Sequence, residues 1–233
     1  MTYVMADLHG NAQRFRDVME KIDLKADDTL YVLGDVIDRY PDGVAILQTL
    51  MELPQAKMLL GNHEYMMLNA LDPQSAGDGG AEAEDARAYA LALWYYNGGM
   101  ATHDAMNALS GEERSRIFRR LRSLPLNLEA TVGEKKFLFV HGAPVSLCPE
   151  GEDPTYWAVW TRLTPDCELP EDKTVIFGHT PTSHYQFTNP LSVWFGQSRI
   201  GIDCGAGYPS DCARSGRLAC VRLEDMAIYY SEN

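Results

Sequence analysis

The sequence GDVIDR, residues 34–39, directly follows the apolar run TLYVL of residues 29–33. A short run of β-branched and aromatic residues that ends in Gly-Asp is typical of a buried parallel strand, which delivers an acidic side chain to a loop. In open α/β sheets, ligands bind at the carboxyl ends of such strands. The stretch therefore predicts an α/β fold with a functional site where this strand ends.

Four other apolar runs end in the same way, with Asp, Asn or His beside a glycine. They lead into DLHG (residues 7–10), GNHE (residues 61–64), HG (residues 141–142) and GHT (residues 178–180). Any one of these motifs also fits helix capping or turn chemistry, in which Asp, Asn and Gly are common. Five of them in one chain, each at the end of a predicted strand, instead indicate a metal site.

The predicted metal ligands are all nitrogen and oxygen donors. They are Asp7, His9, Asp35, Asn62, His141 and His179. This set suits Mn, Fe or Zn and excludes a thiolate site. Asp35 is the expected bridging carboxylate, because its strand is central in the order of the motifs. Two metal ions about 3.5–4 Å apart can share a hydroxide and hold the attacking and leaving oxygens of a displacement.

Four further residues fit phosphoryl transfer. Arg39 and Arg162 can each bind phosphoryl oxygens through a forked guanidinium group. His63 can protonate the departing oxygen, and Asp38 can hold that imidazole by its other nitrogen. Our hypothesis is that a metal-bridging hydroxide attacks phosphorus while the two arginines neutralise the equatorial oxygens.

The first third of the chain alternates between predicted strands and helices, which is typical of a layered α/β fold. The strands are expected near residues 3–6, 29–33 and 56–60, and the helices over residues 11–22, 43–53 and 64–71. Residues 72–125 are then expected to form a helical insertion within a single domain of residues 1–233. The insertion contains a loop at residues 72–80 and helical segments at 84–96, 100–109 and 111–124. It either covers the edge of the site and contributes to substrate recognition, or is a structural flank.

The last part of the chain is predicted to consist mainly of strands. They are expected at residues 127–132, 136–140, 174–177, 193–195, 199–203, 217–223 and 226–230. A loop over residues 143–173 separates the second and third of them. Alternating strands and helices at the front, followed by antiparallel strands at the back, predict a sandwich of two mixed β-sheets flanked by helices.

The composition limits the partners and the compartment. The chain of 233 residues is long enough for one α/β domain with its own core. A net charge of −13 argues against a nucleic-acid duplex, but not against a small phosphoester, because bound cations can reverse the local field. We expect a cytoplasmic protein, since no apolar stretch could cross a bilayer and no signal-peptide pattern opens the sequence. The 5 cysteines include no C-x-x-C pair and are expected to be reduced thiols. The sequence makes no prediction of oligomeric state.

These motifs resemble the metallophosphoesterase (calcineurin-like) superfamily, and most closely the PPP-type serine/threonine protein phosphatases of the bacterial and bacteriophage-lambda kind. The five strand-end motifs occur in that family's order. WTR (residues 160–162), IDCG (residues 202–205) and the GG of residues 98–99 after Trp94 also resemble its segments. The resemblance implies a calcineurin-like sandwich with a helical cap, phosphoprotein phosphatase activity, and two divalent metal ions, with manganese expected before iron or zinc.

The resemblance also implies a role for each site residue. The first metal ion would be bound by Asp7, His9 and Asp35, and the second by Asp35, Asn62, His141 and His179. The catalytic set would be His63, Asp38, Arg39 and Arg162, with the phosphate bound by Arg39, Arg162 and Asn62. Two positions depart from the family pattern. Leu60 stands where the family usually has an arginine, which removes one phosphate contact. Tyr40 stands where it usually has a glycine, and either narrows the cleft, stacks on a substrate or is a surface turn residue.

Three alternatives are weaker. A dinucleoside polyphosphate hydrolase resembles this chain too, but such enzymes often lack the equivalent of Asp38 and carry Asp at the position of Glu64. A serine or threonine alkoxide needs a proton as it leaves, whereas the phosphate released from a phosphoanhydride is already a stable anion. A carboxylate that supports His63 as a proton donor therefore favours the phosphoester substrate. A nuclease or phosphodiesterase of the superfamily often has a second His where this chain has Pro181. A non-catalytic binding module would be expected to lack at least one ligand.

Overall fold

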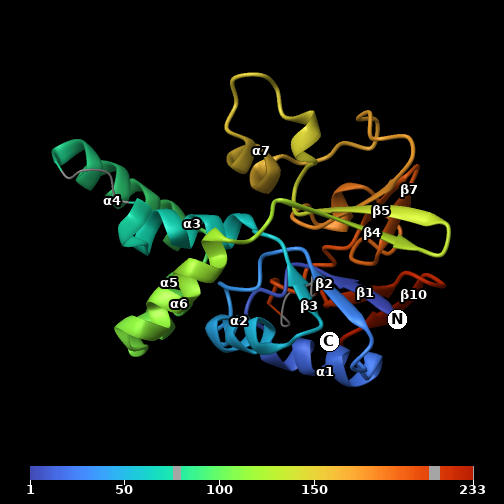
Figure 1. Cartoon of the computed structure of the whole chain (residues 1–233), viewed down its shortest axis with the longest axis horizontal. Helices are drawn as coiled ribbons and strands as arrows, with labels where there is room; N and C mark the ends of the chain where they lie inside the picture. Colours follow the sequence, from blue (N-terminus) through green and yellow to red (C-terminus); the bar gives the residue numbers. More distant parts are fainter. Residues whose placement is uncertain (76–79, 210–215, 233) are drawn as a thin grey trace.

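The part of the chain that the structure describes folds into two mixed β-sheets with five strands each, which pack against one another (Figure 1). The computed structural model describes residues 1–75, 80–209 and 216–232. The first sheet has the order β10-β9-β1-β2-β3, built from β1 (Thr2–Met5), β2 (Thr29–Val32), β3 (Ala56–Met58), β9 (Ala219–Arg222) and β10 (Ala227–Tyr230). The second has the order β4-β5-β6-β8-β7, built from β4 (Asn127–Val132), β5 (Lys135–Val140), β6 (Thr174–Phe177), β7 (Trp194–Gly196) and β8 (Arg199–Gly201). The predicted sandwich of two mixed sheets is confirmed.

The strands that precede the five motifs run parallel within their sheets. β1, β2 and β3 are parallel, and so are β5 and β6. The register pairs Met5 with Val32 and Val32 with Met58, while Val140 pairs with Phe177 in the other sheet. The motifs therefore leave each sheet at the same edge, which brings their polar side chains together.

Alternation along β1 shows how the two sheets bury a core between them. Tyr3 and Met5 belong to a cluster formed with the helices, whereas Val4 belongs to a cluster shared with the second sheet. Successive side chains of a strand point to opposite faces, so one strand serves both cores. Between the sheets, the rings of Tyr31 and Phe139 stack with their centroids 4.2 Å apart.

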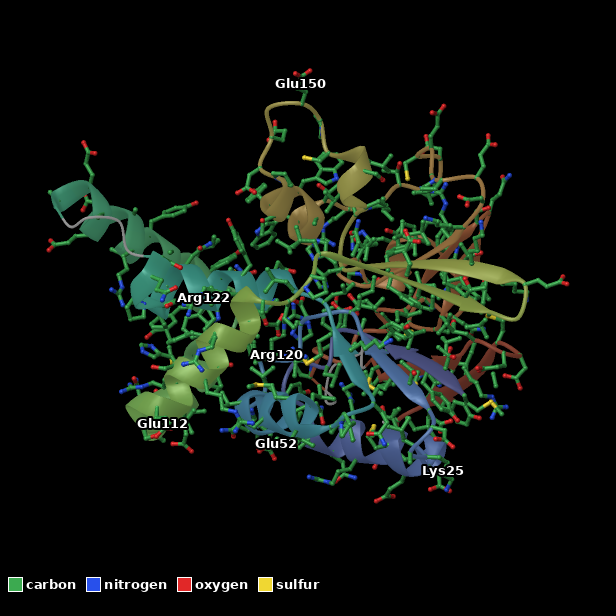
Figure 2. All side chains as sticks on the ribbon, in the orientation of Figure 1. Lys25, Glu52, Glu112, Arg120, Arg122 and Glu150 are labelled. Carbon is green, nitrogen blue, oxygen red and sulfur yellow. The ribbon has the colours of Figure 1, made fainter. Side chains whose placement is uncertain are left out.

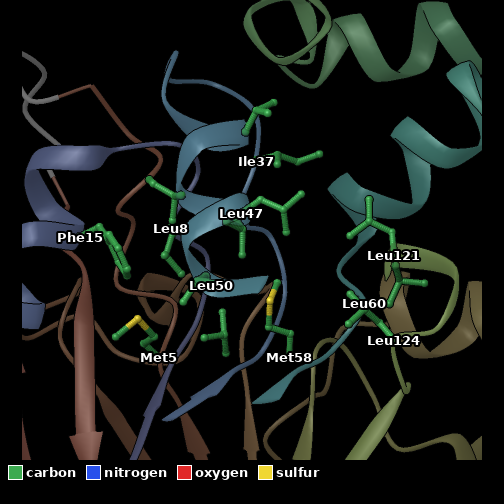
Figure 3. Packing of buried hydrophobic residues seen from close by; sticks show 14 of the residues in the cluster. Met5, Leu8, Phe15, Ile37, Leu47, Leu50, Met58, Leu60, Leu121 and Leu124 are labelled. Carbon is green, nitrogen blue, oxygen red and sulfur yellow. The ribbon is translucent and has the colours of Figure 1, made fainter. Parts of the chain in front are cut away.

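Helices pack on the outer face of the first sheet, extend to one side of it and, at residues 154–160, pack beside the second sheet. They are α1 (Ala12–Ile22), α2 (Gly43–Glu52), α3 (Asn62–Leu71), α4 (Ala81–Tyr96), α5 (Met100–Ala108), α6 (Gly111–Arg122) and α7 (Pro154–Trp160). Phe15 of α1 and Leu47 and Leu50 of α2 are in one buried cluster with Met5 and Met58 of the strands (Figure 3). The helices that follow α3, from α4 to α6, lie to one side of the sheets in Figure 1.

The helical insertion is attached to the rest of the molecule through a buried apolar contact. Leu121 and Leu124, at the end of the insertion, belong to the same cluster as Leu60, which precedes α3 (Figure 3). The three helices predicted within the insertion are present. Its limits of 72–125, and the assignment of residues 1–233 to one domain, stay predictions.

One helix was not predicted. α7 lies inside the segment expected to be a loop over residues 143–173. It begins with Asp153, whose side chain accepts hydrogen bonds from the backbone N–H groups of Thr155 and Tyr156, and Pro154 occupies its first turn. Asp followed by Pro is a helix-start signal, but the helix is only 7 residues long, too short for its periodicity to stand out.

Charged side chains lie at the periphery, as Lys25, Glu52, Glu112 and Glu150 do in Figure 2. Within the ranges that the structure describes, no helix combines the length and the apolar character needed to span a membrane. The four described cysteines, Cys148, Cys167, Cys204 and Cys220, are all free thiols. Cys212 lies outside the described residues.

Candidate metal centre and active site

A cleft of about 150 Å³ lies where the strand-end motifs meet. Its lining includes most of the site residues expected from the sequence: Asp7, His9, Asp35, Arg39, Asn62, His63, Arg162 and His179. The other two, Asp38 and His141, are fully buried beside it. Segments from both sheets therefore contribute to one site.

Asp35 lies at the centre of the site. Its Oδ1 atom is 3.4 Å from Nε2 of His141, and its Oδ2 atom is 3.9 Å from Nε2 of His9 and 3.8 Å from Nε2 of His63. Two groups of potential ligands share Asp35, one with His9 and His63 and the other with His141 and His179, each with donor atoms within 4.8 Å of one another. A carboxylate common to both groups has the position that a bridging ligand requires.

The second group brings lone pairs together. Nδ1 of His141 donates to Leu33 O at 2.6 Å, and Nε2 of His179 donates to Trp160 O at 3.1 Å. The remaining ring nitrogens then carry lone pairs, and both face Oδ1 of Asn62, at 2.9 Å from His141 and 2.8 Å from His179. Acceptors that converge in this way are suited to hold a cation between them, and imidazoles oriented by backbone carbonyls are typical metal ligands.

Three buried carboxyl groups lie close together in the same cleft. Burial, with the charges of Asp203 and Asp35, raises the pKa of Asp7 well above its ordinary value. Burial likewise raises the pKa of Asp203 to about 6. By contrast, the imidazoles of His141, His63 and His9 outweigh burial and hold the pKa of Asp35 well below its usual range. Divalent cations would stabilise all three acids in their ionised form, so the residues present fit a metal centre.

The positions of two acidic residues, Asp7 and Asp203, differ from what the sequence predicts. Asp7 lines the cleft, but among the described residues it is in neither three-residue ligand group, and both its carboxylate oxygens accept from the backbone N–H of His179, at 3.0 and 3.1 Å. Asp203 lines the cleft without having been assigned a role from the sequence. Its place within the late IDCG motif was the available signal.

The backbone of the site is strained. Residues with positive φ include Asp7 (56°), His9 (50°), Asp35 (53°), Asp38 (74°), Arg39 (68°) and His179 (61°). Left-handed conformations are uncommon for residues other than glycine and persist where the surrounding structure enforces them. A buried carboxylate does so here. Glu64 accepts from the backbone N–H groups of Asp35, Val36, Ile37 and Gly61, at 2.8–3.3 Å.

Gly61 allows two of the motifs to approach closely. A Cβ atom at this position would lie 2.3 Å from both the backbone nitrogen and Oδ1 of Asp35. No side chain fits at such a distance, so the glycine lets the third strand end directly against the second motif. As a result the backbone N–H of His63 donates to Oδ1 of Asp35 at 3.0 Å.

His63 and Asp38 form a buried pair at the side of the cleft. Nδ1 of His63 is 2.6 Å from Oδ2 of Asp38, and the two residues are 2% and 0% exposed. Burial acts to lower the pKa of His63, but the carboxylates of Asp35 and Asp38 outweigh it and raise the pKa above its ordinary value. An imidazole whose pKa is raised, held by a carboxylate, is suited to act as a proton donor.

Two arginines supply positive charge to the cleft. Arg39 and Arg162 both line it and are both exposed. Arg162 donates from Nη1 to the carbonyl oxygen of His179 at 3.3 Å, which holds it beside the predicted ligands. Exposed guanidinium groups beside a metal centre are suited to binding a phosphoryl group.

The two unusual positions, Leu60 and Tyr40, lie outside the cleft lining. Leu60 is 6% exposed and packs in the apolar cluster with Leu121 and Leu124. The Tyr40 hydroxyl donates to the carbonyl oxygen of Tyr208, at 3.0 Å, and Tyr208 does line the cleft. Tyr40 therefore contacts the cleft only indirectly, through the backbone of Tyr208, and Leu60 packs between the core and the insertion.

Leu60→Arg is expected to destabilise the protein and not to strengthen phosphate binding. An arginine placed in this apolar cluster would bury an unpaired charge, and we expect the free energy of unfolding to fall by about 3–5 kcal/mol. Urea denaturation measures this change. Met100→Arg is the control, because Met100 is 60% exposed and an arginine there should change the free energy of unfolding by less than about 0.5 kcal/mol. Unchanged stability with tighter phosphate binding in Leu60→Arg would show that this side chain reaches the cleft.

Comparison with known proteins places the chain in a family. Residues 2–204 match the model of the calcineurin-like phosphoesterase family. The chain is 39% identical over 69 residues to a symmetrical bis(5'-nucleosyl)-tetraphosphatase of Nitrosomonas europaea, a match that covers 29% of this chain and 26% of that protein. It is 26% identical over 140 residues to serine/threonine-protein phosphatase 2 of Salmonella typhimurium, covering 60% of this chain and 56% of that protein.

Solved structures agree with the fold. The crystal structure of a proposed diadenosine tetraphosphatase superposes with a TM-score of 0.61 at 18% identity, covering 98% of this chain and 91% of that one. The curated relatives are matched over a quarter to about half of their length. The family match covers most of the chain, and the five strand-end motifs lie within it. The chain therefore belongs to the calcineurin-like phosphoesterase family.

Proposed function

We propose that this protein removes phosphoryl groups from phosphoserine and phosphothreonine in proteins. The observation that carries this proposal is the buried pair of His63 and Asp38, 2.6 Å apart at the side of the cleft. A serine or threonine alkoxide is a poor leaving group and needs a proton as the P–O bond breaks. A carboxylate-supported imidazole next to the cleft supplies that proton.

The proposal assigns the predicted ligands to two divalent ions, with manganese as the first choice and iron or zinc as alternatives. One ion would be held by Asp7, His9 and Asp35, and the other by Asp35, Asn62, His141 and His179. When bound, the ions polarise the phosphoryl group and activate water for attack. Arg39 and Arg162 bind and orient the phosphoryl oxygens, assisted by the amide of Asn62, and His63 protonates the oxygen that leaves.

Dinucleoside polyphosphate hydrolysis is the second candidate. It is favoured by the 39% identity to the Nitrosomonas enzyme over 69 residues, a higher identity than the phosphatase relative shows over its longer match. In that reaction the leaving group is a nucleotide phosphate, which departs as a stable anion. Such a leaving group needs no proton, so the buried pair of His63 and Asp38 would have no role as a proton donor. We therefore place this candidate second.

A paired assay distinguishes the two candidates. We expect kcat/KM in the presence of manganese to be higher for a phosphothreonine peptide than for a dinucleoside tetraphosphate at equal concentration. As a control, the same reactions are run with a chelator in place of manganese. Any hydrolysis that remains then comes from contaminating metal-independent hydrolases. A preference for the nucleotide would contradict the protein-phosphatase proposal and would mean that the changes at Leu60 and Tyr40 accompany a different substrate class.

A further inference from the structure

The end of α4, the turn after it and the start of α5 form a segment that makes three polar contacts with the loop that carries Asp38. This segment, residues 94–102, has the sequence WYYNGGMAT. The indole Nε1–H of Trp94 donates to Oδ2 of Asp38 at 2.8 Å. The hydroxyl oxygen of Thr102 accepts from the backbone N–H of Asp38 at 2.9 Å, and the carbonyl oxygen of Gly98 accepts from the backbone N–H of Arg39 at 3.0 Å.

These contacts fall on two strained residues. Asp38 and Arg39 have φ values of 74° and 68°, both in the left-handed region. Two consecutive residues other than glycine hold such a conformation only when neighbouring groups fix their backbone. The N–H groups of both residues are bound by the insertion, so the insertion fixes this turn.

The packing inside the insertion holds the Trp94 ring in the position that makes this contact. It is fully buried, and a Cβ atom at position 99 would lie 2.4 Å from its indole ring, so Gly99 is required for the ring to occupy its place. The indole N–H and Nδ1 of His63 meet the same atom, Oδ2 of Asp38. The tryptophan thus fixes the carboxylate from one side while the imidazole binds it from another.

We propose that Trp94 and Thr102 are positioning residues, through which the helical insertion sets the geometry of the Asp38–His63 pair and of Arg39. On this view the insertion is part of the catalytic apparatus, not a structural flank. Its assignment to catalysis rests on the proposed role of His63 as proton donor. The contact itself is independent of that role and can be tested separately.

The contact is tested by NMR of the indole groups. The protein has 4 tryptophans, so a ¹⁵N-indole-labelled sample gives one N–H signal for each. We expect the Trp94 signal to be protected from hydrogen exchange, and to lose this protection in Asp38→Ala while the other indole signals keep their positions. A Trp94 signal that is the same in both proteins would overturn the proposal, whatever the protein hydrolyses.

The positioning role is tested by comparing leaving groups. Trp94→Phe keeps a buried ring but removes the indole N–H, and we expect about a tenfold loss of kcat on a phosphothreonine peptide with KM unchanged. On p-nitrophenyl phosphate, whose phenolate needs little protonation, the loss should be less than about twofold. Trp157→Phe is the matched control, because Trp157 donates its indole N–H to the carbonyl oxygen of Pro144 at 3.1 Å, outside this turn. It should leave both rates unchanged.

Thr102 provides a second variant that changes the packing less. Thr102→Val removes the hydroxyl acceptor at nearly constant shape and should reproduce the selective loss, whereas Thr102→Ser keeps the hydroxyl and should restore the rate. Equal losses on both substrates in Trp94→Phe and Thr102→Val would show a merely structural role and overturn the proposal. A wild-type protein that hydrolyses neither phosphoester would refute the proposed function, and the exchange experiment would then decide the contact alone.

Discussion

Asp35→Asn is expected to remove both metal ions and to lower kcat/KM by roughly a thousandfold. Asp35 belongs to both groups of potential ligands, and its two oxygens face different histidines, His141 on one side and His9 on the other. Loss of its charge therefore weakens both ion sites at once. Metal ions contribute several kcal/mol of transition-state stabilisation, and each 1.36 kcal/mol corresponds to a factor of ten in rate.

The choice of asparagine makes the result interpretable. The carboxylate also accepts from the backbone N–H of His63, at 3.0 Å, and an amide oxygen can keep that hydrogen bond while losing the charge. Metal content is measured by elemental analysis of the purified protein, with circular dichroism to verify the fold. Asp104→Asn is the control: Asp104 is an exposed residue of the insertion, so this variant should retain both ions. Full metal content in Asp35→Asn would exclude Asp35 as the bridging ligand.

The residues of the candidate site could be predicted from the sequence more fully than the residues that support them, for a physical reason. The predicted ligand motifs follow strands, and parallel strands of one sheet end at a common edge, so a local pattern is enough to bring Asp35 and Asn62 together. His179 follows β6 of the second sheet and joins them through the packing of the two sheets. The fold class followed from the same alternation of strands and helices. The roles assigned to the individual site residues remain proposals.

What the sequence did not predict depends on contacts between distant segments. Glu64 was given no structural role from the sequence, yet its carboxylate binds backbone N–H groups of two loops. Trp94 was noticed only as a point of family resemblance, and its contact with Asp38 joins residues 56 positions apart. The hydrophobic periodicity of the sequence cannot predict such a contact, because the contact depends on how the insertion packs against the rest of the protein.

His63→Asn should reduce turnover of a phosphothreonine peptide by about 10²–10⁴-fold while p-nitrophenyl phosphate hydrolysis falls by less than about tenfold. His63 is bound to Asp38 through Nδ1, and its Nε2 atom lies on the side of Asp35, 3.8 Å from Oδ2, where the cleft opens. The carboxylates of Asp35 and Asp38 raise the pKa of His63 above its ordinary value despite burial, which favours the protonated form that a proton donor requires. Asparagine can still bind Asp38 but cannot deliver a proton.

The test depends on the ratio of the rates on the phosphothreonine peptide and on p-nitrophenyl phosphate. Loss of a metal ligand or of the fold would lower both rates, whereas loss of the proton donor lowers mainly the first. His184→Asn is a suitable control: His184 also lines the cleft but is not among the proposed ligands or the acid pair, so it should change both rates by the same factor. Equal losses on the two substrates in His63→Asn would instead place His63 in the ligand group with His9 and Asp35, whose donor atoms lie within 4.8 Å of its own. The leaving-group dependence thus separates the two roles that the geometry permits for this one side chain.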